Sequence, residues 1–201
     1  MSSYILAVTG ASGTIYGKRL VEVLLSKDHR VKLLISKPGE EVLAHELDFQ
    51  LEGDEKEKER RLKEWLGLKY NDPSLEYIDY LNFSAPICSG SCKTDGMIII
   101  PCSMSTVAGV AQGISSNLIQ RAADVMLKER RPLILVPRET PLNEIHLRNM
   151  LILVQAGAFI VPAMPGFYHR PQNIDDLVDF IVGRVLDILG IEHDLYPPWG
   201  G

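Results

Sequence analysis

Residues 4–13 read Tyr-Ile-Leu-Ala-Val-Thr-Gly-Ala-Ser-Gly and lead directly into a helical pattern that starts at Thr14. An apolar strand, a tight glycine-rich turn and a helix N-terminus form a site whose N–H groups and helix dipole favour an anion. We therefore interpret residues 10–13 as a phosphate-binding turn at the end of the first strand. The other polar clusters of the chain fall where they can converge on this turn.

Short apolar segments alternate with helical patterns along the whole chain. Strands that are apolar throughout imply a parallel sheet with both faces covered by helices. The predicted fold is therefore α/β and doubly wound, a Rossmann- or flavodoxin-like parallel sheet with helices on both faces, in a single domain spanning residues 1–201. The expected strands cover 4–9, 31–36, 75–78 (weakly), 97–102, 132–137 and 158–162, and the expected helices cover 14–27, 38–48, 54–66, 104–112, 117–129, 143–156 and 174–190.

Length and composition exclude several classes of protein. The 201 residues suffice for one substantial core, and a formal net charge of −5 argues against a general nucleic-acid binder. We expect a cytoplasmic protein, because the first residues lack the pattern of a signal peptide and no apolar run reaches membrane-spanning length. Cys88, Cys92 and Cys102 lack the pairing and histidine spacing of a zinc site, so reduced thiols and no bound metal are expected.

The spacing of the first turn favours a mononucleotide over a dinucleotide. It matches neither G-x-G-x-x-G nor the short-chain dehydrogenase pattern. Ser36 ends the second strand, where a dinucleotide site needs an acidic residue for the ribose. FMN therefore fits better than NAD. A role for Ser36 as the N-cap of the next helix is an equally strong interpretation.

Hydroxyl groups and charges follow the later strands. Three hydroxyls within residues 103–106 are more than a helix cap needs, which favours contact with an anion or a flavin edge. Arg138 and Glu139 lie between two prolines after the fifth strand. A rigid turn that holds a guanidinium beside a carboxyl suits the binding and protonation of a phosphate monoester.

Helical spacing organises the polar residues between the fourth and fifth strands. Asn117 and Gln120 resemble a capping box, and Arg121 and Lys128 share one helical face because they are seven residues apart. Several other polar features have simpler interpretations or stay open. They are the mixed-charge run 52–63 (a solvated helix face or mobile excursion), Arg130 and Arg131 (surface charge), His146 (structural), His169 (role open) and Trp199 (idle or packed on a neighbouring subunit).

Taken together, the motifs resemble the UbiX-type flavin prenyltransferase family, whose members were formerly described as aromatic-acid decarboxylase subunits. The resemblance runs from residue 4 to Trp199 and is most specific between Asn117 and Leu142. Its motifs are TGASG (9–13), LISK (34–37), Glu46-Leu-Asp48, SGS (89–91), PCSMST (101–106), the block 117–142, the stretch His146–Met150 and PGFYHRPQ (165–172).

Members of this family attach a dimethylallyl group to N5 of reduced FMN and then close a fourth ring at C6. Their product is prenylated FMN, the cofactor that UbiD-type decarboxylases use. The resemblance implies dimethylallyl phosphate as the donor, with the choice between monophosphate and diphosphate left open. It also implies a homo-oligomer, commonly a dodecamer built of trimers, with sites that form between subunits and no role for nucleic acid or membrane.

The resemblance further implies three sets of site residues. The first would bind FMN: Gly10, Ala11, Ser12, Ser36, Ser103, Met104, Ser105, Thr106 and Arg121. The second would bind the prenyl phosphate: Ser89, Gly90, Ser91, Lys128, Arg138, Glu139, Tyr168 and Arg184. The third would be catalytic: Ser12 near flavin N5, Glu46 as the acid/base of ring closure, and Glu139 as the acid beside the leaving phosphate.

These residue types suit the chemistry. Fixed cations stabilise the charge that develops on the departing phosphate, so no metal is required, and an aromatic, water-poor pocket protects an allyl cation. Phe83 stands where family members carry Trp and offers a weaker π face, so the cation steps are expected to be slower. Two alternatives are an FMN-dependent cysteine-type decarboxylase of the same fold, whose motifs are replaced here, and a non-catalytic flavin carrier subunit. The Arg138–Glu139 pair argues against the carrier.

Overall fold

Six parallel strands form one sheet in the order β3-β2-β1-β4-β5-β6 in a computed structural model that describes residues 1–197. The order reverses between β1 and β4, so the crevice outside their carboxyl ends is the topological switch point of a doubly wound fold. The predicted fold class is thereby confirmed. The strands are β1 (Ser3–Val8), β2 (Arg30–Ile35), β3 (Leu75–Tyr77), β4 (Gly96–Cys102), β5 (Leu133–Pro137) and β6 (Phe159–Ile160).

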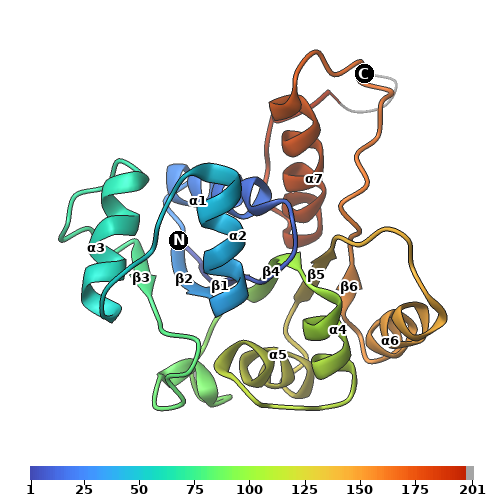
Figure 1. Cartoon of the computed structure of the whole chain (residues 1–201), viewed down its shortest axis with the longest axis horizontal. Coiled ribbons are helices and arrows are strands. Elements are labelled where there is room, and N and C mark those ends of the chain that lie inside the picture. Colours follow the sequence, from blue (N-terminus) through green and yellow to red (C-terminus); the bar gives the residue numbers. More distant parts are fainter. Residues whose placement is uncertain (198–201) are drawn as a thin grey trace.

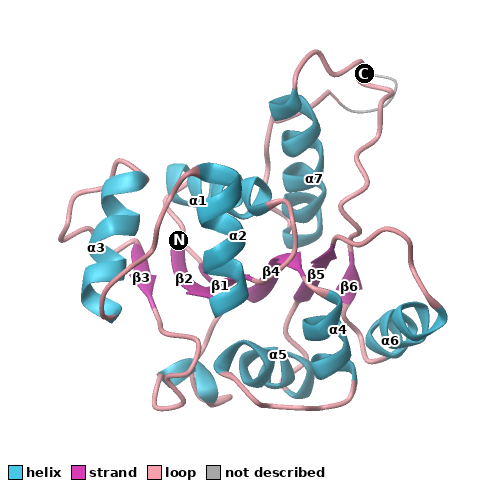
Figure 2. Cartoon of the chain, viewed as in Figure 1, coloured by secondary structure: helices cyan, strands magenta, loops and turns pink. Residues whose placement is uncertain are grey.

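Helices cover both faces of the sheet (Figures 1 and 2). Successive side chains of β1 point to opposite faces: Leu6 and Val8 join one buried cluster, and Ile5 and Ala7 join the other. The first cluster packs under α1 (Thr14–Ser26), α2 (Lys37–Leu47), α3 (Glu55–Trp65) and α7 (Ile174–Leu189). The second packs under the short helix η1 (Pro86–Cys88), α4 (Met104–Ala111), α5 (Leu118–Lys128) and α6 (Glu144–Gln155).

The seven expected helices agree with the observed ones to within one residue at each end. The strands at the two edges of the sheet are shorter than predicted. β6 is confined to Phe159–Ile160, although the Val161 amide still donates to the Leu135 carbonyl at 2.9 Å. Pro162 lacks an N–H and therefore cannot extend the ladder.

The mixed-charge run forms α3, whose outer face is solvated as predicted: the side chains of Arg60 and Glu64 are 49% and 76% exposed. It is anchored to its neighbours and is not a mobile excursion. Lys63 of α3 is only 4% exposed and donates to Glu59 at 2.7 Å and to the Tyr70 carbonyl at 3.2 Å. Lys58 pairs with the buried Glu40 of α2. The charges of α3 thus tie it to its neighbours, while Leu62 enters the core.

Within residues 1–197, no helix combines the length and the apolar character that a membrane span requires. The packing role considered for Trp199 lies outside the described residues.

Candidate functional site at the carboxyl ends of β1 and β4

Thr9 joins the two loops that flank the switch point. Its hydroxyl donates to the Pro101 carbonyl at 3.0 Å and accepts from the Ser103 amide at 2.8 Å. Its own amide donates to the Pro101 carbonyl at 3.2 Å. Because Thr9 is buried, these bonds fix the turn after β1 against the start of α4. Thr9 opens the TGASG motif, but no role was predicted for its side chain; a threonine directly before the glycine-rich turn was the available signal.

The side chain of Glu46, which belongs to α2, binds at the N-terminus of α1. Its carboxylate accepts from the Gly13 amide at 2.9 and 3.0 Å and from the Thr14 amide and hydroxyl, each at 2.8 Å. Partial burial raises the pKa of Glu46, but hydrogen bonds from the Ser12 and Thr14 side chains and from the two amides outweigh it and hold the pKa below its usual value. The N-terminus of α1 therefore binds a carboxylate of the same chain, and the phosphate contact expected of residues 10–13 stays a prediction.

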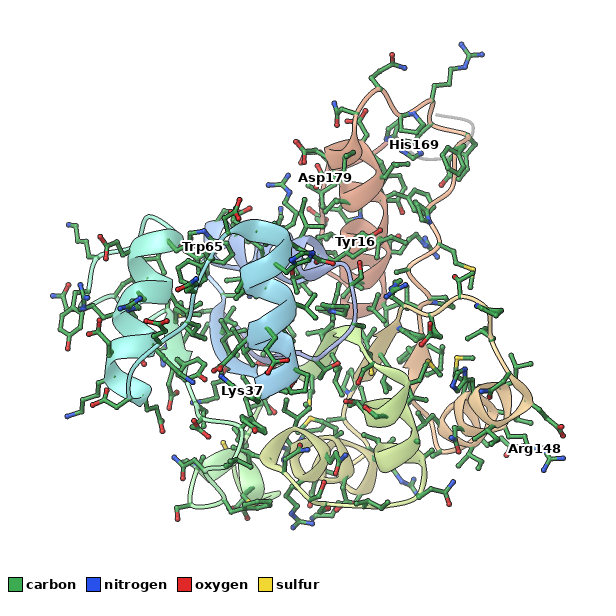
Figure 3. The ribbon with its side chains drawn as sticks, in the orientation of Figure 1. Tyr16, Lys37, Trp65, Arg148, His169 and Asp179 are labelled. Atoms are coloured by element: carbon green, nitrogen blue, oxygen red, sulfur yellow. The ribbon has the colours of Figure 1, made fainter. Side chains whose placement is uncertain are left out.

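A cavity of about 380 Å³ brings Ser12, Glu46 and Arg138 together. Apolar side chains from α1, the 163–165 segment and α7 complete its wall, with Tyr16 among them. Figure 3 shows Tyr16 projecting from α1 beside α7. Burial raises the pKa of Tyr16, which keeps its hydroxyl neutral. Sequence analysis did not single out Tyr16, because one tyrosine in an amphipathic helix carries no distinguishing signal.

One buried polar atom beside the switch point fits a ligand that carries a hydrogen-bond acceptor. The Nε atom of Arg138 is buried without a partner among the described residues, although a guanidinium is an obligatory donor. The Arg138 amide donates to the Cys102 carbonyl at 3.4 Å, which places this residue at the carboxyl end of β5 next to β4. A flavin or a phosphate would supply the acceptor that Nε lacks.

The hydroxyl groups after β2 and β4 act as helix caps. Ser36 accepts from the Gly39 amide at 3.2 Å, and Ser103 accepts from the Thr106 amide at 3.3 Å. The Ser103 hydroxyl also lies 3.0 Å from the hydroxyls of Ser105 and Thr106. Capping therefore uses one of the three hydroxyls of α4, and the other two stay clustered at its N-terminus. Gly10 permits the close approach of the first turn to α2, since a Cβ there would lie 2.5 Å from Cβ of Pro38.

The 89–91 loop is fixed by arginines of α5 and of the segment that follows it. Arg131 donates to the Gly90 carbonyl at 2.7 Å and to the Cys92 carbonyl at 2.6 Å, so its interpretation as plain surface charge is wrong. Arg121 donates to the Cys88 carbonyl at 3.0 Å and to Asp124 at 2.7 Å. Lys128 pairs with Glu129 directly beside Gly90, where an added Cβ would lie 2.9 Å from the lysine Nζ.

Tyr168 and Arg184 line a different cavity, of about 620 Å³, beside the C-terminal half of α7. Arg184 donates to Asp187 at 2.7 Å. Glu139 belongs to neither cavity lining: its exposed carboxylate accepts from the Thr140 amide at 3.0 Å. The expected contact between the Arg138 guanidinium and the Glu139 carboxyl is not among those formed by the described residues.

The predicted phosphate ligands thus fall into three groups within one chain. Arg138 is at the carboxyl ends of the strands. Lys128 is the last residue of α5 and lies near the amino ends, because the carbonyl of Pro132, four residues later, accepts a hydrogen bond from Met97 of β4. Arg184 lies on α7, on the face of the sheet opposite to α5. One small phosphate cannot touch all three groups in a single chain. The sequence shows that these residues are present, but their distribution over the two faces of the sheet and both ends of its strands becomes visible only in the fold.

Two smaller predictions have clear outcomes. His146 is structural: it forms a capping box with Asn143 at the start of α6. The predicted capping box of α5 is only half formed, because Asn117 caps the Gln120 amide but the Gln120 side chain turns back to Ser116 instead.

No group of histidine, cysteine and acidic side chains suited to a metal ion occurs between residues 1 and 197.

Comparison with known proteins identifies relatives of this chain and of its fold. Residues 2–186 match the family model described as Flavoprotein. The chain is 50% identical to "Flavin prenyltransferase UbiX" of Halalkalibacterium halodurans over 197 residues, 98% of this chain and 93% of the relative. Among solved structures, AnUbiX in complex with FMN and dimethylallyl pyrophosphate superposes with a TM-score of 0.88 at 38% identity, covering 100% and 98% of the two chains. A dodecameric FMN-dependent UbiX-like decarboxylase from Escherichia coli O157:H7 superposes with a TM-score of 0.87 at 40% identity, covering 99% and 100%.

Proposed function

This chain belongs to the UbiX family of flavin prenyltransferases, and on that premise we propose that it transfers a dimethylallyl group from dimethylallyl phosphate to N5 of reduced FMN and closes a fourth ring at C6. The observation that carries the proposal is the convergence of Ser12, Glu46 and Arg138 on one cavity at the switch point of a flavoprotein fold. The product, prenylated FMN, would be passed to a UbiD-type decarboxylase. The place of this reaction would be the cytoplasm.

FMN would enter as a substrate that supplies the nucleophilic ring atoms. It would be held by the turn at Gly10, Ala11 and Ser12 and by the hydroxyls of Ser36 and residues 103–106. Arg121, which is bonded to the Cys88 carbonyl, would contact it as well. The apolar wall around Tyr16 would exclude water from the reacting edge. At neutral pH the lowered pKa of Glu46 keeps it a carboxylate, which can take a proton through its hydrogen bond to Ser12.

The donor phosphate requires positive charge that does not depend on a metal. Arg138, Lys128 and Arg184 would stabilise the dianion as the allylic C–O bond breaks, and Glu139 would protonate it. These cations lie apart within a single chain. We therefore propose that the complete site forms where subunits meet. Association would place Lys128 or Arg184 of one copy beside Arg138 of another.

The exposed face of α6 is a suitable surface for such association. Leu147, Leu151 and Val154 share this face by their helical spacing and are each more than half exposed, and Phe159 of the neighbouring β6 is 46% exposed. An apolar surface of this kind on one helix marks an interaction site. A second copy of this chain is the occupant we propose, because the similar UbiX-like structure from Escherichia coli is dodecameric.

The proposed activity predicts a change in flavin mass. Anaerobically reduced FMN, incubated with the purified protein and dimethylallyl monophosphate or diphosphate, is expected to gain the mass of one dimethylallyl unit. Liquid chromatography with mass spectrometry measures the product and shows which donor is used. An unchanged flavin mass with both donors would refute the transferase and leave the cysteine-type decarboxylase or the carrier.

The association surface predicts that Leu151→Glu dissociates the oligomer. A glutamate at an apolar interface is buried without a partner, and each leucine that loses such burial costs about 1.5–3 kcal/mol. Size-exclusion chromatography with light scattering should show a smaller assembly, and turnover should fall with it. Tyr70→Glu, at an exposed aromatic between α3 and β3, is the matched control. An unchanged mass for Leu151→Glu would remove α6 from the interface.

A further inference from the structure

The C-terminal segment 191–197 folds back onto α7 beside Arg184. The rings of His193 and Tyr196 lie directly on the helix backbone at Gly183, where a Cβ would come within 2.7 and 2.4 Å of them. Any side chain at Gly183 would therefore displace the segment. Tyr196 also packs on Phe180 with a ring-centroid distance of 5.0 Å, and Phe180 contacts the Tyr168 ring at 5.6 Å.

The Asp187 carboxylate accepts three hydrogen bonds beside this segment. Its Oδ2 atom accepts from Arg184 at 2.7 Å and from the Tyr196 hydroxyl at 2.9 Å. Its Oδ1 atom lies 3.2 Å from Nε2 of His193. Nδ1 of His193 accepts from the Leu195 amide at 3.3 Å, so the neutral ring carries its proton on Nε2 and donates to Asp187.

Arg184, Asp187 and Tyr196 thereby form a closed triangle. The Tyr196 hydroxyl also hydrogen-bonds Arg184, and this contact is the main reason that the pKa of the guanidinium is raised. A guanidinium has five N–H donors in a fixed plane, and the triangle engages it on one side. Arg184 and Tyr168 line the same cavity, so N–H groups outside the triangle are available to a ligand there.

We propose that Tyr196 is a positioning residue for the donor-phosphate site: through its hydroxyl and Asp187, the folded-back C-terminal segment fixes the Arg184 guanidinium in the orientation that binds the phosphate. The inference rests on the proposed function, in which Arg184 is a phosphate ligand. An arginine side chain has several rotatable bonds, and part of their freedom is lost when the side chain binds a ligand. A guanidinium that is held in advance loses less of it, so the phosphate binds more tightly.

Asp187 alone would oppose an anion, because it is a carboxylate beside the guanidinium. Tyr196 and His193 reduce that opposition by donating hydrogen bonds to both of its oxygens. Removal of the Tyr196 hydroxyl would therefore act twice. It would loosen Arg184, and it would leave Asp187 free to compete more strongly with the phosphate for the same N–H groups.

Tyr196→Phe tests the proposal, because the ring that packs on Gly183 and Phe180 is kept and only the hydroxyl is lost. We expect the KM for dimethylallyl phosphate to rise about 10-fold, with kcat within about twofold and the FMN Kd unchanged. Binding of inorganic phosphate, measured by titration calorimetry, should weaken by a similar factor. Tyr70→Phe, at a tyrosine that is 66% exposed, is the control and should change none of these values.

A double-mutant cycle with Arg184→Lys shows whether Tyr196 acts through Arg184. Tyr196→Phe should have little further effect on KM in the Arg184→Lys background. An equal rise in KM in both backgrounds, or no rise in either, would overturn the proposal. Calorimetry with inorganic phosphate reads the same coupling without turnover, so failure of the prenyl transfer itself would be recognised separately.

Discussion

Replacement of Glu139 by alanine is expected to leave FMN bound and to lower turnover by about 100-fold, the usual scale for loss of a general acid. Glu139 is exposed at the carboxyl end of β5, and its carboxylate contacts only the neighbouring Thr140 amide among the bonds formed by the described residues. Its removal therefore has little structural cost. The measurements are the visible absorption of bound flavin and the rate of prenylated product formation under anaerobic conditions.

The control for this experiment is Glu64→Ala, which removes another exposed carboxyl, on α3 and far from the strand ends. It should retain full turnover. Loss of FMN from the Glu139 variant would contradict the assigned role and make this residue a flavin contact. Unchanged turnover would mean that the departing phosphate takes its proton from another group.

Local patterns in the sequence were sufficient to predict the fold. Continuous apolar strands such as 97–102, each followed by an amphipathic helix, can be satisfied only by a parallel sheet covered on both faces. Prediction was poorest at the edges of the sheet, as in β6, because a short edge strand depends on pairing with one neighbour. The anchoring of Lys63 also escaped prediction, since a buried lysine depends on a carbonyl seven residues away.

The candidate site was only partly predictable. Ser12 and Arg138 follow strand ends, and the strand order brings such residues together, so their convergence follows from topology. The capture of the α1 N-terminus by Glu46 depends on the path of α2, which no pattern in residues 10–13 reveals. The position of Arg131 is likewise set by a contact distant in sequence, to the Gly90 carbonyl, and that of Tyr196 depends on how the segment after α7 folds back to Asp187.

Glu46→Gln should separate the two chemical steps, and we expect the overall rate of ring closure to fall by about 100-fold or more. Ring closure removes a proton from flavin C6 and adds one to the prenyl chain, so it isomerises the flavin without changing its mass. The single amide oxygen of glutamine can accept part of the hydrogen bonds that Gly13 and Thr14 give to the two carboxylate oxygens, but the side chain cannot take up a proton at neutral pH. Mass spectrometry should therefore still show the gain of one dimethylallyl unit, while the absorption spectrum should differ from that of the four-ring product.

A stability measurement distinguishes this loss of proton transfer from damage to the fold. The Glu46 carboxylate caps α1 with a pKa below its usual 4.5, so its stabilisation is present above pH 4.5 and is lost as the pH falls through the pKa of the folded state. The free energy of unfolding of Glu46→Gln should be lower than that of the unmodified protein by about 1 kcal/mol at pH 7, and the difference should shrink below pH 4.5. If the variant forms the four-ring product at the normal rate, the proton of ring closure passes through another group, and Glu46 serves only to hold the Ser12–Thr14 turn in place.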